Sequence, residues 1–262
     1  MTLSNPMQVG RNVAKKILTY SKRGLHLADL DPISSWYYAV INRQSHRNLL
    51  FEAKPYVNYY EFGVGVRTLG RYLSSLKLFC ERTGYAMADF HVYAFDSFQG
   101  LPPKKDEKDN YVEWKQGSFR TTLPVLKKQL NALGFNPDAP NLHFVPGYYE
   151  KTLTKNLQND LKSHPPSIVT VDVDYYSSTI QVLNWLKPIL KSGVIFYFDD
   201  IWAFDGSPYY GQPAAIHQFN KHRDGGLLVY PEFGMDGCAY IYWKRKFSES
   251  HSKPDLRKMR IT

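Results

Sequence analysis

Residues 57–68 decide the fold, and they read Val57-Asn58-Tyr59-Tyr60-Glu61-Phe62-Gly63-Val64-Gly65-Val66-Arg67-Thr68. The apolar run predicts a β-strand over Val57–Glu61, and the glycines that follow predict a tight turn. Beyond the turn, apolar residues recur at helical spacing from Leu69 to Cys80, which predicts one buried helix face. Gly84 is a typical stop signal for such a helix. This stretch is therefore a strand, a glycine turn and a helix.

The same alternation continues along the chain. Helices are predicted over residues 123–133 and, with Ser178 as the cap, over residues 178–190. The Pro- and Lys-rich residues 102–110, which precede the first of these helices, predict a long mobile loop. Further strands are predicted at 91–95, 142–145, 168–171, 194–198 and 239–243, the last in a hairpin with 227–230. Strands that alternate with helices favour an α/β fold with a parallel sheet. The pattern leaves the order of the strands open.

Carboxylates stand at four of the five predicted parallel strand ends. They are Glu61, Asp96, Asp172 with Asp174, and Asp199 with Asp200. In open α/β sheets, ligands bind outside the carboxyl ends of the strands. A single such Asp is more often a helix cap, but the whole set predicts a functional site.

The glycine turn does not fit a nicotinamide dinucleotide. The fingerprint for such a cofactor needs a third glycine three residues after the second, whereas Gly70 comes too late after Gly65. An acidic residue directly before the turn, Glu61, suits a cationic ligand such as S-adenosylmethionine. A turn that only packs a helix on a strand is the simpler alternative. Asp96 could accept both hydroxyls of a ribose, or it could cap its own turn.

Three carboxylates follow two strands that we expect to be neighbours. Asp172, Asp199 and Asp200 together suit a hard divalent cation such as Mg²⁺. One of these carboxylates could take the proton from a substrate hydroxyl whose pKa the metal has lowered. The alternative is that they cap helices in solvent.

Composition excludes several classes of protein. A hydrophobic fraction of 43% is enough for a sizeable core, which excludes a disordered or collagen-like chain. Two cysteines, Cys80 and Cys238, form no disulfide framework and fit a reducing compartment. No apolar run reaches the roughly 20 residues of a membrane span, and residues 1–22 lack the features of a signal peptide. We therefore expect a soluble cytoplasmic protein.

The net charge of +9 is carried by the two ends of the chain. Residues 1–55 and 244–262 each hold five more basic than acidic residues, and the middle has a net charge of −1. A nucleic-acid groove would make the middle basic, so nucleic acid is not the favoured partner. We expect a helical N-terminal cap over 1–55, a catalytic domain over 56–246 and a basic C-terminal tail over 247–262.

Five motifs carry a family resemblance. They lie at residues 96–102 (DSFQGLP), 147–153 (GYYEKTL), 171–179 (VDVDYYSST), 198–200 (FDD) and 242–244 (YWK). Their order and spacing resemble those of the macrocin O-methyltransferase (TylF-like) family. The resemblance covers about residues 56–246. It implies a class I methyltransferase, a Rossmann-like fold with a seven-stranded, mostly parallel sheet and helices on both faces. It also implies S-adenosylmethionine as methyl donor, Mg²⁺ as cofactor, and a hydroxyl acceptor, often on a sugar of a natural product or polysaccharide.

The resemblance also implies roles for residues. Those that would contact the methyl donor are Glu61, Gly63, Gly65 and Thr68 on the methionine part, Asp96 and Ser97 on the ribose, Gly147 and Tyr148 on the adenine side, and Asp172. Asp172, Asp199 and Asp200 would hold the metal, with Asp172 the favoured base and Asp174 the alternative. Val173 stands where the family usually has glycine, which would narrow the acceptor site.

Other functions stay open at this point. An RNA methyltransferase would explain the charge, and a non-catalytic binding protein could retain the fold. His217 could assist as a base, although a surface position is the simpler reading. Tyr209 and Tyr210, like the aromatic residues at 36–38, suit either a sugar pocket or packing. The small-molecule acceptor and any homo-oligomer cannot be read from the sequence.

Overall fold

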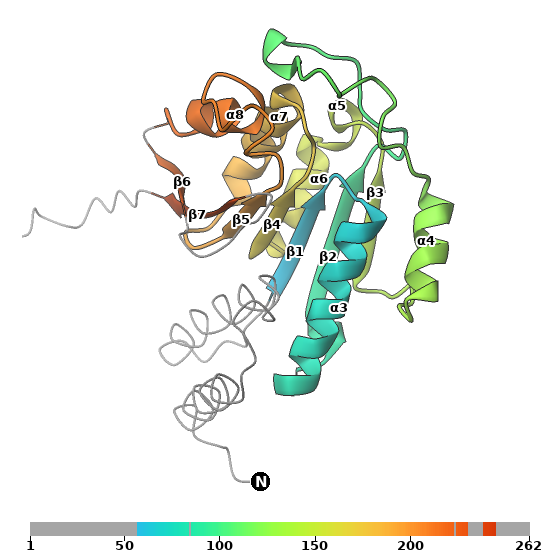
Figure 1. Cartoon of the computed structure of the whole chain (residues 1–262). Coiled ribbons are helices and arrows are strands. Elements are labelled where there is room, and N and C mark those ends of the chain that lie inside the picture. The colour runs from blue at the N-terminus through green and yellow to red at the C-terminus, as the bar shows by residue number, and fades with distance from the viewer. Residues whose placement is uncertain (1–56, 84, 223, 230–237, 245–262) are drawn as a thin grey trace, which may run out of the picture.

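The computed structural model describes residues 57–83, 85–222, 224–229 and 238–244 (Figure 1). The expected N-terminal cap, the aromatic residues at 36–38 and the basic tail lie outside these ranges. In the part that is described, no helix is long and apolar enough to cross a membrane.

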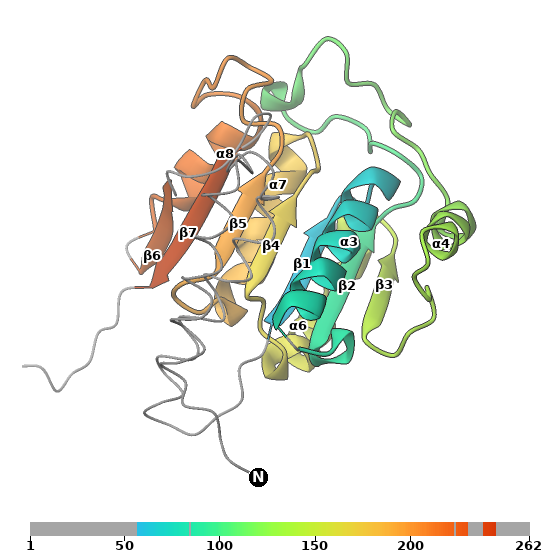
Figure 2. The same cartoon turned by 60° about the horizontal axis from the view of Figure 1, so that its bottom comes forward.

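A seven-stranded sheet forms the centre of the domain, with the order β3-β2-β1-β4-β5-β7-β6 (Figure 2). Its strands are β1 (Val57–Phe62), β2 (Phe90–Asp96), β3 (Leu142–Pro146), β4 (Ile168–Val171), β5 (Ile195–Phe198), β6 (Gly225–Val229) and β7 (Cys238–Lys244). The first five strands are parallel, and β7 runs antiparallel to both β5 and β6. The predicted α/β class and the mostly parallel sheet are confirmed.

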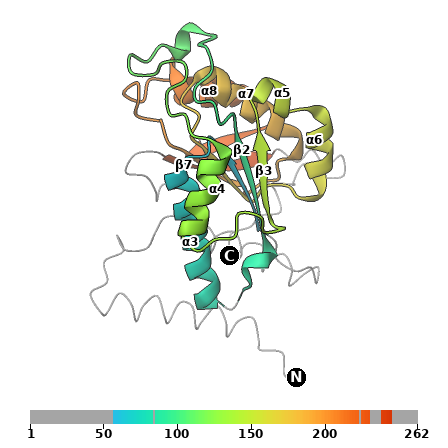
Figure 3. The ribbon, with the colours of Figure 1, turned by 90° about the vertical axis from the view of Figure 1, so that its right-hand side faces the viewer.

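Helices cover both faces of the sheet (Figure 3). On one face, α3 (Val66–Thr83) and α4 (Leu123–Ala132) bury a core around Tyr72 and Leu126. On the other face lie α5 (Tyr149–Thr152), α6 (Lys155–Asp160), α7 (Tyr176–Leu186) and α8 (Gly211–Phe219). Because the central strands are buried on both faces, they are continuous apolar runs rather than alternating ones.

The strand order fixes where a ligand can bind. The chain runs from β1 outward to β3 on one side, then returns to β4 beside β1 and continues on the other side. Such a reversal leaves a crevice at the carboxyl ends of β1 and β4, which is the usual ligand position in open α/β sheets.

The start of α7 differs from the prediction. The helix begins at Tyr176, so Ser178 lies inside its first turn and is not the cap. The backbone N–H of Ser177 instead donates to Oδ1 of Asp109, over 2.9 Å. The cap is supplied by a residue far away in the sequence, which a local pattern cannot reveal. Asp109 belongs to the predicted loop at 102–110, which is therefore fastened to the domain and contains a short 3₁₀ turn over Glu107–Asp109.

Candidate active site

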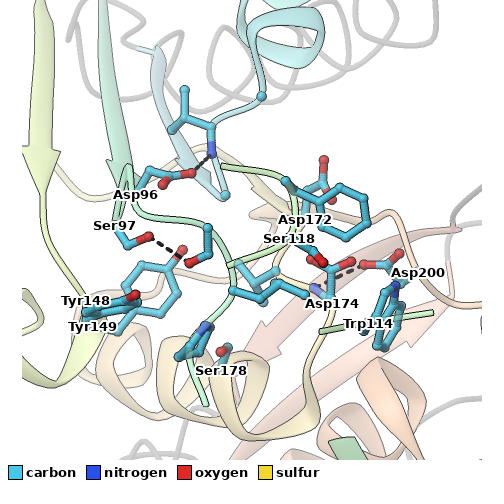
Figure 4. A pocket seen from close by; sticks show the side chains of 18 of the residues that line it. Asp96, Ser97, Trp114, Ser118, Tyr148, Tyr149, Asp172, Asp174, Ser178 and Asp200 are labelled. Atoms are coloured by element: carbon cyan, nitrogen blue, oxygen red, sulfur yellow. Dashed lines mark hydrogen bonds between the residues drawn. The ribbon is translucent and has the colours of Figure 1, made fainter. Parts of the chain in front are cut away.

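A cavity of about 550 Å³ opens at the carboxyl ends of the parallel strands (Figure 4). This volume is in the range of small-molecule sites. Among the predicted site residues, the cavity is lined by Gly63, Gly65, Asp96, Ser97, Tyr148, Asp172, Asp174, Asp199 and Asp200. Glu61 and Gly147 are not in its wall, and the side chain of Thr68 lies outside the described part of the structure. The strand-end carboxylates other than Glu61 thus share one cavity.

Asp96 joins the glycine turn to the end of β2. Its Oδ2 accepts from the backbone N–H of Val64 over 2.7 Å, and its Oδ1 accepts from that of Phe98 over 2.5 Å (Figure 4). Burial raises the pKa of this carboxyl, and the two backbone donors oppose that rise. The Ser97 side chain also opposes the rise, and because a carboxylate has about four acceptor sites, acceptor capacity remains for a ligand hydroxyl.

Gly63 allows the ends of three strands to meet. Its φ is +80°, and a Cβ at this position would overlap the backbone carbonyl of Asp172. Its N–H also donates to the carbonyl of Phe95 over 3.0 Å. Only glycine adopts this backbone at no steric cost and leaves room for Asp172. The glycine turn therefore sets the distance between the Asp96 side and the Asp172 side of the cavity.

Glu61 lies beneath the turn and is fully buried. The hydroxyl of Tyr59 donates to its Oε2 over 3.1 Å, whereas Oε1 has no hydrogen-bond partner among the described residues. Burial raises the pKa of Glu61 well above its usual value, and the charges of Asp172 and Asp96 add to this rise. The side chain that was expected to face the methionine part of the donor is thus behind the wall of the cavity.

Gly147 and Tyr148 follow β3 at the other side of Asp96. The N–H of Gly147 donates to the backbone carbonyl of Asp96 over 2.8 Å, and its φ is +133°. This bond places Tyr148 in the cavity wall beside Ser97 (Figure 4).

The carboxylates after β4 and β5 form a tight cluster. One oxygen each of Asp172, Asp174 and Asp200 can be chosen so that all lie within 4.8 Å of one another. Burial raises the pKa values of Asp174 and Asp200 to about 8, and neighbouring carboxylates add to both shifts. Such a cluster favours a bound cation or retained protons. The sequence named Asp199 in place of Asp174; Asp199 also lines the cavity and accepts from the hydroxyl of Tyr197 over 3.1 Å.

Gln212 supports this cluster and was not predicted. The side chain is fully buried at the start of α8. Its Nε2 donates to the carbonyl of Val171 over 3.0 Å, and its Oε1 accepts from the N–H of Asp200 over 3.0 Å. Gln212 thereby connects the ends of β4 and β5. No local sequence signal distinguishes this glutamine from an exposed one.

The roof of the cavity was also missed. Leu101, Trp114 and Phe119, from the segment after β2, also line it. Trp114 packs against Tyr175 and Phe204, with ring centroids 6.0 and 5.7 Å apart. Tyr209 and Tyr210 are exposed near this roof but do not line the cavity, and His217 is exposed on α8.

Comparison with known proteins identifies the fold and the family. The family model of macrocin-O-methyltransferase (TylF) matches residues 78–245, which is well over half of the chain. The match begins after the glycine turn, so the turn is outside it. A search of curated proteins found no significant match.

Solved structures agree with this fold. The calicheamicin methyltransferase CalS11 is 18% identical over 92% of this chain and 94% of its own, with a TM-score of 0.58. The O-methyltransferase NovP is 17% identical over 81% of this chain and 79% of its own, with a TM-score of 0.49. The likeness to CalS11 shows a class I methyltransferase fold. With the family match, it follows that this chain belongs to the macrocin-O-methyltransferase (TylF) family and is an S-adenosylmethionine-dependent O-methyltransferase.

Proposed function

We propose that the chain is a Mg²⁺-dependent O-methyltransferase that acts on a hydroxyl of a small molecule, on a sugar of a natural product or polysaccharide. One observation carries the proposal: the carboxylate cluster of Asp172, Asp174 and Asp200 shares a cavity with Asp96 and the glycine turn. A cation site and a nucleoside site are thus next to each other, as metal-assisted methyl transfer to a hydroxyl requires.

The residues around Asp96 fit S-adenosylmethionine. Asp96 keeps acceptor capacity for a ribose hydroxyl, and Gly63 and Gly65 let a ligand approach the backbone closely. When bound, S-adenosylmethionine would supply a sulfonium methyl group whose carbon forms a bond to the acceptor oxygen as its bond to sulfur breaks, with S-adenosylhomocysteine as the leaving group.

The donor set at the ends of β4 and β5 fits Mg²⁺, because it consists of carboxylate oxygens, the ligands that this hard cation prefers. We assign Asp172, Asp199 and Asp200 to the cation. When bound, Mg²⁺ lowers the pKa of a coordinated hydroxyl.

We assign the proton acceptor to Asp174, whereas the sequence favoured Asp172. Burial and the neighbouring carboxylates raise the pKa of Asp174 to about 8. A base whose pKa lies near the working pH transfers protons most efficiently. The positive φ of Asp174, +58°, holds its side chain beside Asp200 at the floor of the cavity.

The charge of the cavity suits an acceptor without phosphate groups. Six carboxylates line it; Glu150 pairs with Lys105 from the segment after β2, and no Lys or Arg is found among the described residues of the wall itself. The positive charge of one divalent cation and one cationic methyl donor does not exceed the negative charge of these carboxylates. No positive charge therefore remains to bind a phosphate. A neutral or cationic hydroxyl compound is therefore the acceptor class that we propose.

Calorimetric titration with S-adenosylhomocysteine tests the donor site. Asp96→Asn keeps the shape of the side chain but leaves it fewer acceptor positions, so we expect the Kd to rise at least about tenfold. Asp138→Asn is the control, because the Asp138 side chain is 74% exposed and does not line the cavity. Equal affinity of wild type and Asp96→Asn would contradict the assignment of Asp96, and no binding to the wild type would contradict the proposed function.

A further inference from the structure

The segment that follows β2 crosses the top of the cavity as a closed strap, which we define as residues 101–118. Its two ends are joined, because the N–H of Leu101 donates to Ser118 and that of Gly117 donates to Leu101, over 3.0 and 2.9 Å. Figure 1 shows the strap in green, above the carboxyl ends of the strands and next to α7 and α8. Leu101, Trp114 and Ser118 of the strap line the cavity.

Asp109 is the buried side chain that bonds the far end of the strap to α7, beside an ion pair of Lys105 with Glu150 of α5. It is fully buried and does not line the cavity. Its Oδ2 accepts from the N–H groups of Lys105 and Asp106, each over 3.1 Å, which fixes the turn of the strap itself. Its Oδ1 accepts from the N–H of Ser177 over 2.9 Å. One carboxylate thus connects the strap to the second residue of α7.

Helix α7 depends on this contact. Its own N-cap residue, Tyr175, makes no side-chain cap bond, and its first turn contains no acidic residue. The first N–H groups of a helix need acceptors, and a negative charge is favoured at that end. Asp109 supplies both from a distant part of the chain. Because α7 starts directly after Asp172 and Asp174, the same contact restrains the backbone that carries these carboxylates.

Two further contacts near Asp109 also join the strap to the start of α7. The Nζ of Lys108 lies 4.9 Å from the centre of the Tyr176 ring, at the first residue of α7. Trp114 packs on Tyr175, the residue before it. The strap therefore contacts the segment after β4 through Lys108 and Trp114 as well as through Asp109.

We propose that Asp109 is a positioning residue, which fixes the roof of the acceptor half of the cavity to the start of α7 and thereby to the catalytic carboxylates. The importance of this link for methyl transfer rests on the proposed function, whereas the link itself does not. Asp109 touches neither donor nor acceptor, and it acts through the positions of Trp114 and Asp174.

Two substitutions distinguish the bonds that Asp109 makes within the strap from the bond that it makes to α7. Asp109→Asn retains an oxygen for the N–H of Ser177, but its amide cannot accept from Lys105 and Asp106. Asp109→Ala removes all three bonds. Glu107→Gln is the matched control, because Glu107 lies in the same 3₁₀ turn and is exposed.

Hydrogen exchange measured by mass spectrometry tests the link without any acceptor. In Asp109→Ala we expect exchange at least about tenfold faster in peptides of the strap and of residues 175–180, with α3 and β2 unchanged. Asp109→Asn should accelerate the strap but not residues 175–180, and Glu107→Gln should match the wild type. Unchanged exchange at 175–180 in Asp109→Ala would overturn the proposal, and so would equal acceleration throughout the chain, which indicates only lower stability.

The affinity for Mn²⁺, used as a probe of the carboxylate cluster, tests the consequence for the site. We expect the Kd for Mn²⁺ to rise at least about tenfold in Asp109→Ala and to stay within about threefold of wild type in Glu107→Gln. An unchanged Kd in Asp109→Ala overturns the positioning role. A wild type that binds no Mn²⁺ contradicts the proposed function instead, and the exchange data then decide on the link alone.

Discussion

The backbone N–H of Asp174 donates a hydrogen bond to Oδ2 of Asp200, over 3.2 Å. This bond connects the segments after β4 and β5 and brings two buried carboxyl groups together. Burial and mutual charge then raise the pKa values of both groups to about 8. The cluster therefore tends to retain a proton when no cation is present.

The stability of the metal-free protein should fall as the pH rises from about 4, near the pKa of these carboxyls in the unfolded chain, to about 8, their pKa in the folded protein. The folded protein retains protons on Asp174 and Asp200 in this window, whereas the unfolded chain has lost them near its usual carboxyl pKa of about 4. The folded state binds more protons, so unfolding becomes easier as the pH rises. Thermal unfolding with chelator should show this decline, and Mg²⁺ should offset it more at the higher pH.

Asp174→Asn is the comparison for that measurement. The variant lacks one of the two titrating carboxyls, so its stability should change less with pH than that of the wild type. Identical pH profiles of the two proteins would show that the cluster does not retain a proton.

Gly63→Ala should damage the protein far more than Gly117→Ala. Both glycines have a φ near +80°, but an added Cβ meets nothing within 4 Å at Gly117 and overlaps the backbone of Asp172 at Gly63. We expect Gly117→Ala to reduce the free energy of unfolding by about 1–2 kcal/mol, from the backbone conformation alone. Gly63→Ala should reduce it by at least about 3 kcal/mol. Denaturant unfolding measures both, and equal losses would contradict the close contact between the turn and β4.

Gln212→Ala should weaken both the fold and the metal site. It leaves the carbonyl of Val171 and the N–H of Asp200 without their buried partner, which we expect to destabilise the protein by about 2–3 kcal/mol. The Kd for Mn²⁺ should also rise, because Asp200 loses its support. Gln129→Ala on the exposed side of α4 is the control. If both variants behave like the wild type, the bridge between β4 and β5 is unimportant.

The ligand set of the cation is tested by exchanging one carboxylate at a time. With Asp199 as ligand and Asp174 as base, Asp199→Asn should raise the Kd for Mn²⁺ at least about tenfold, and Asp174→Asn should leave it within about threefold. Electron paramagnetic resonance of free Mn²⁺ measures both. The reverse result would assign Asp174 to the cation, as the close grouping of Asp172, Asp174 and Asp200 alone would suggest.

The sequence was informative where local patterns determine structure. Apolar runs mark the strands, so the carboxylates that follow them, such as Asp96 and Asp172, could be placed at one edge of the sheet. It was silent where the partner is distant. Asp109 caps α7 from 68 positions away, and Gln212 binds the backbone of Val171 from 41 positions away. Ser178 was mistaken for the cap because the sequence near α7 does not contain the real one.

Glu61 is a second residue whose surroundings were not predicted from the sequence. Its place before the glycine turn suggested a direct contact with the donor, but the alternation of side chains along β1 turns it toward α3, where Tyr59 holds it. The strand order, too, could not be predicted, because apolar runs do not state which strands are neighbours.

The central claim is that the methyl donor and a divalent cation occupy neighbouring places in one cavity. It is tested most directly by the ¹³C resonance of S-adenosylmethionine labelled at its methyl group and bound to the protein. We predict that Mn²⁺ broadens this resonance strongly, that Mg²⁺ does not, and that the broadening is lost in Asp200→Asn but kept in Asp138→Asn. A resonance that stays narrow with Mn²⁺, or broadening that persists in Asp200→Asn, would contradict the account.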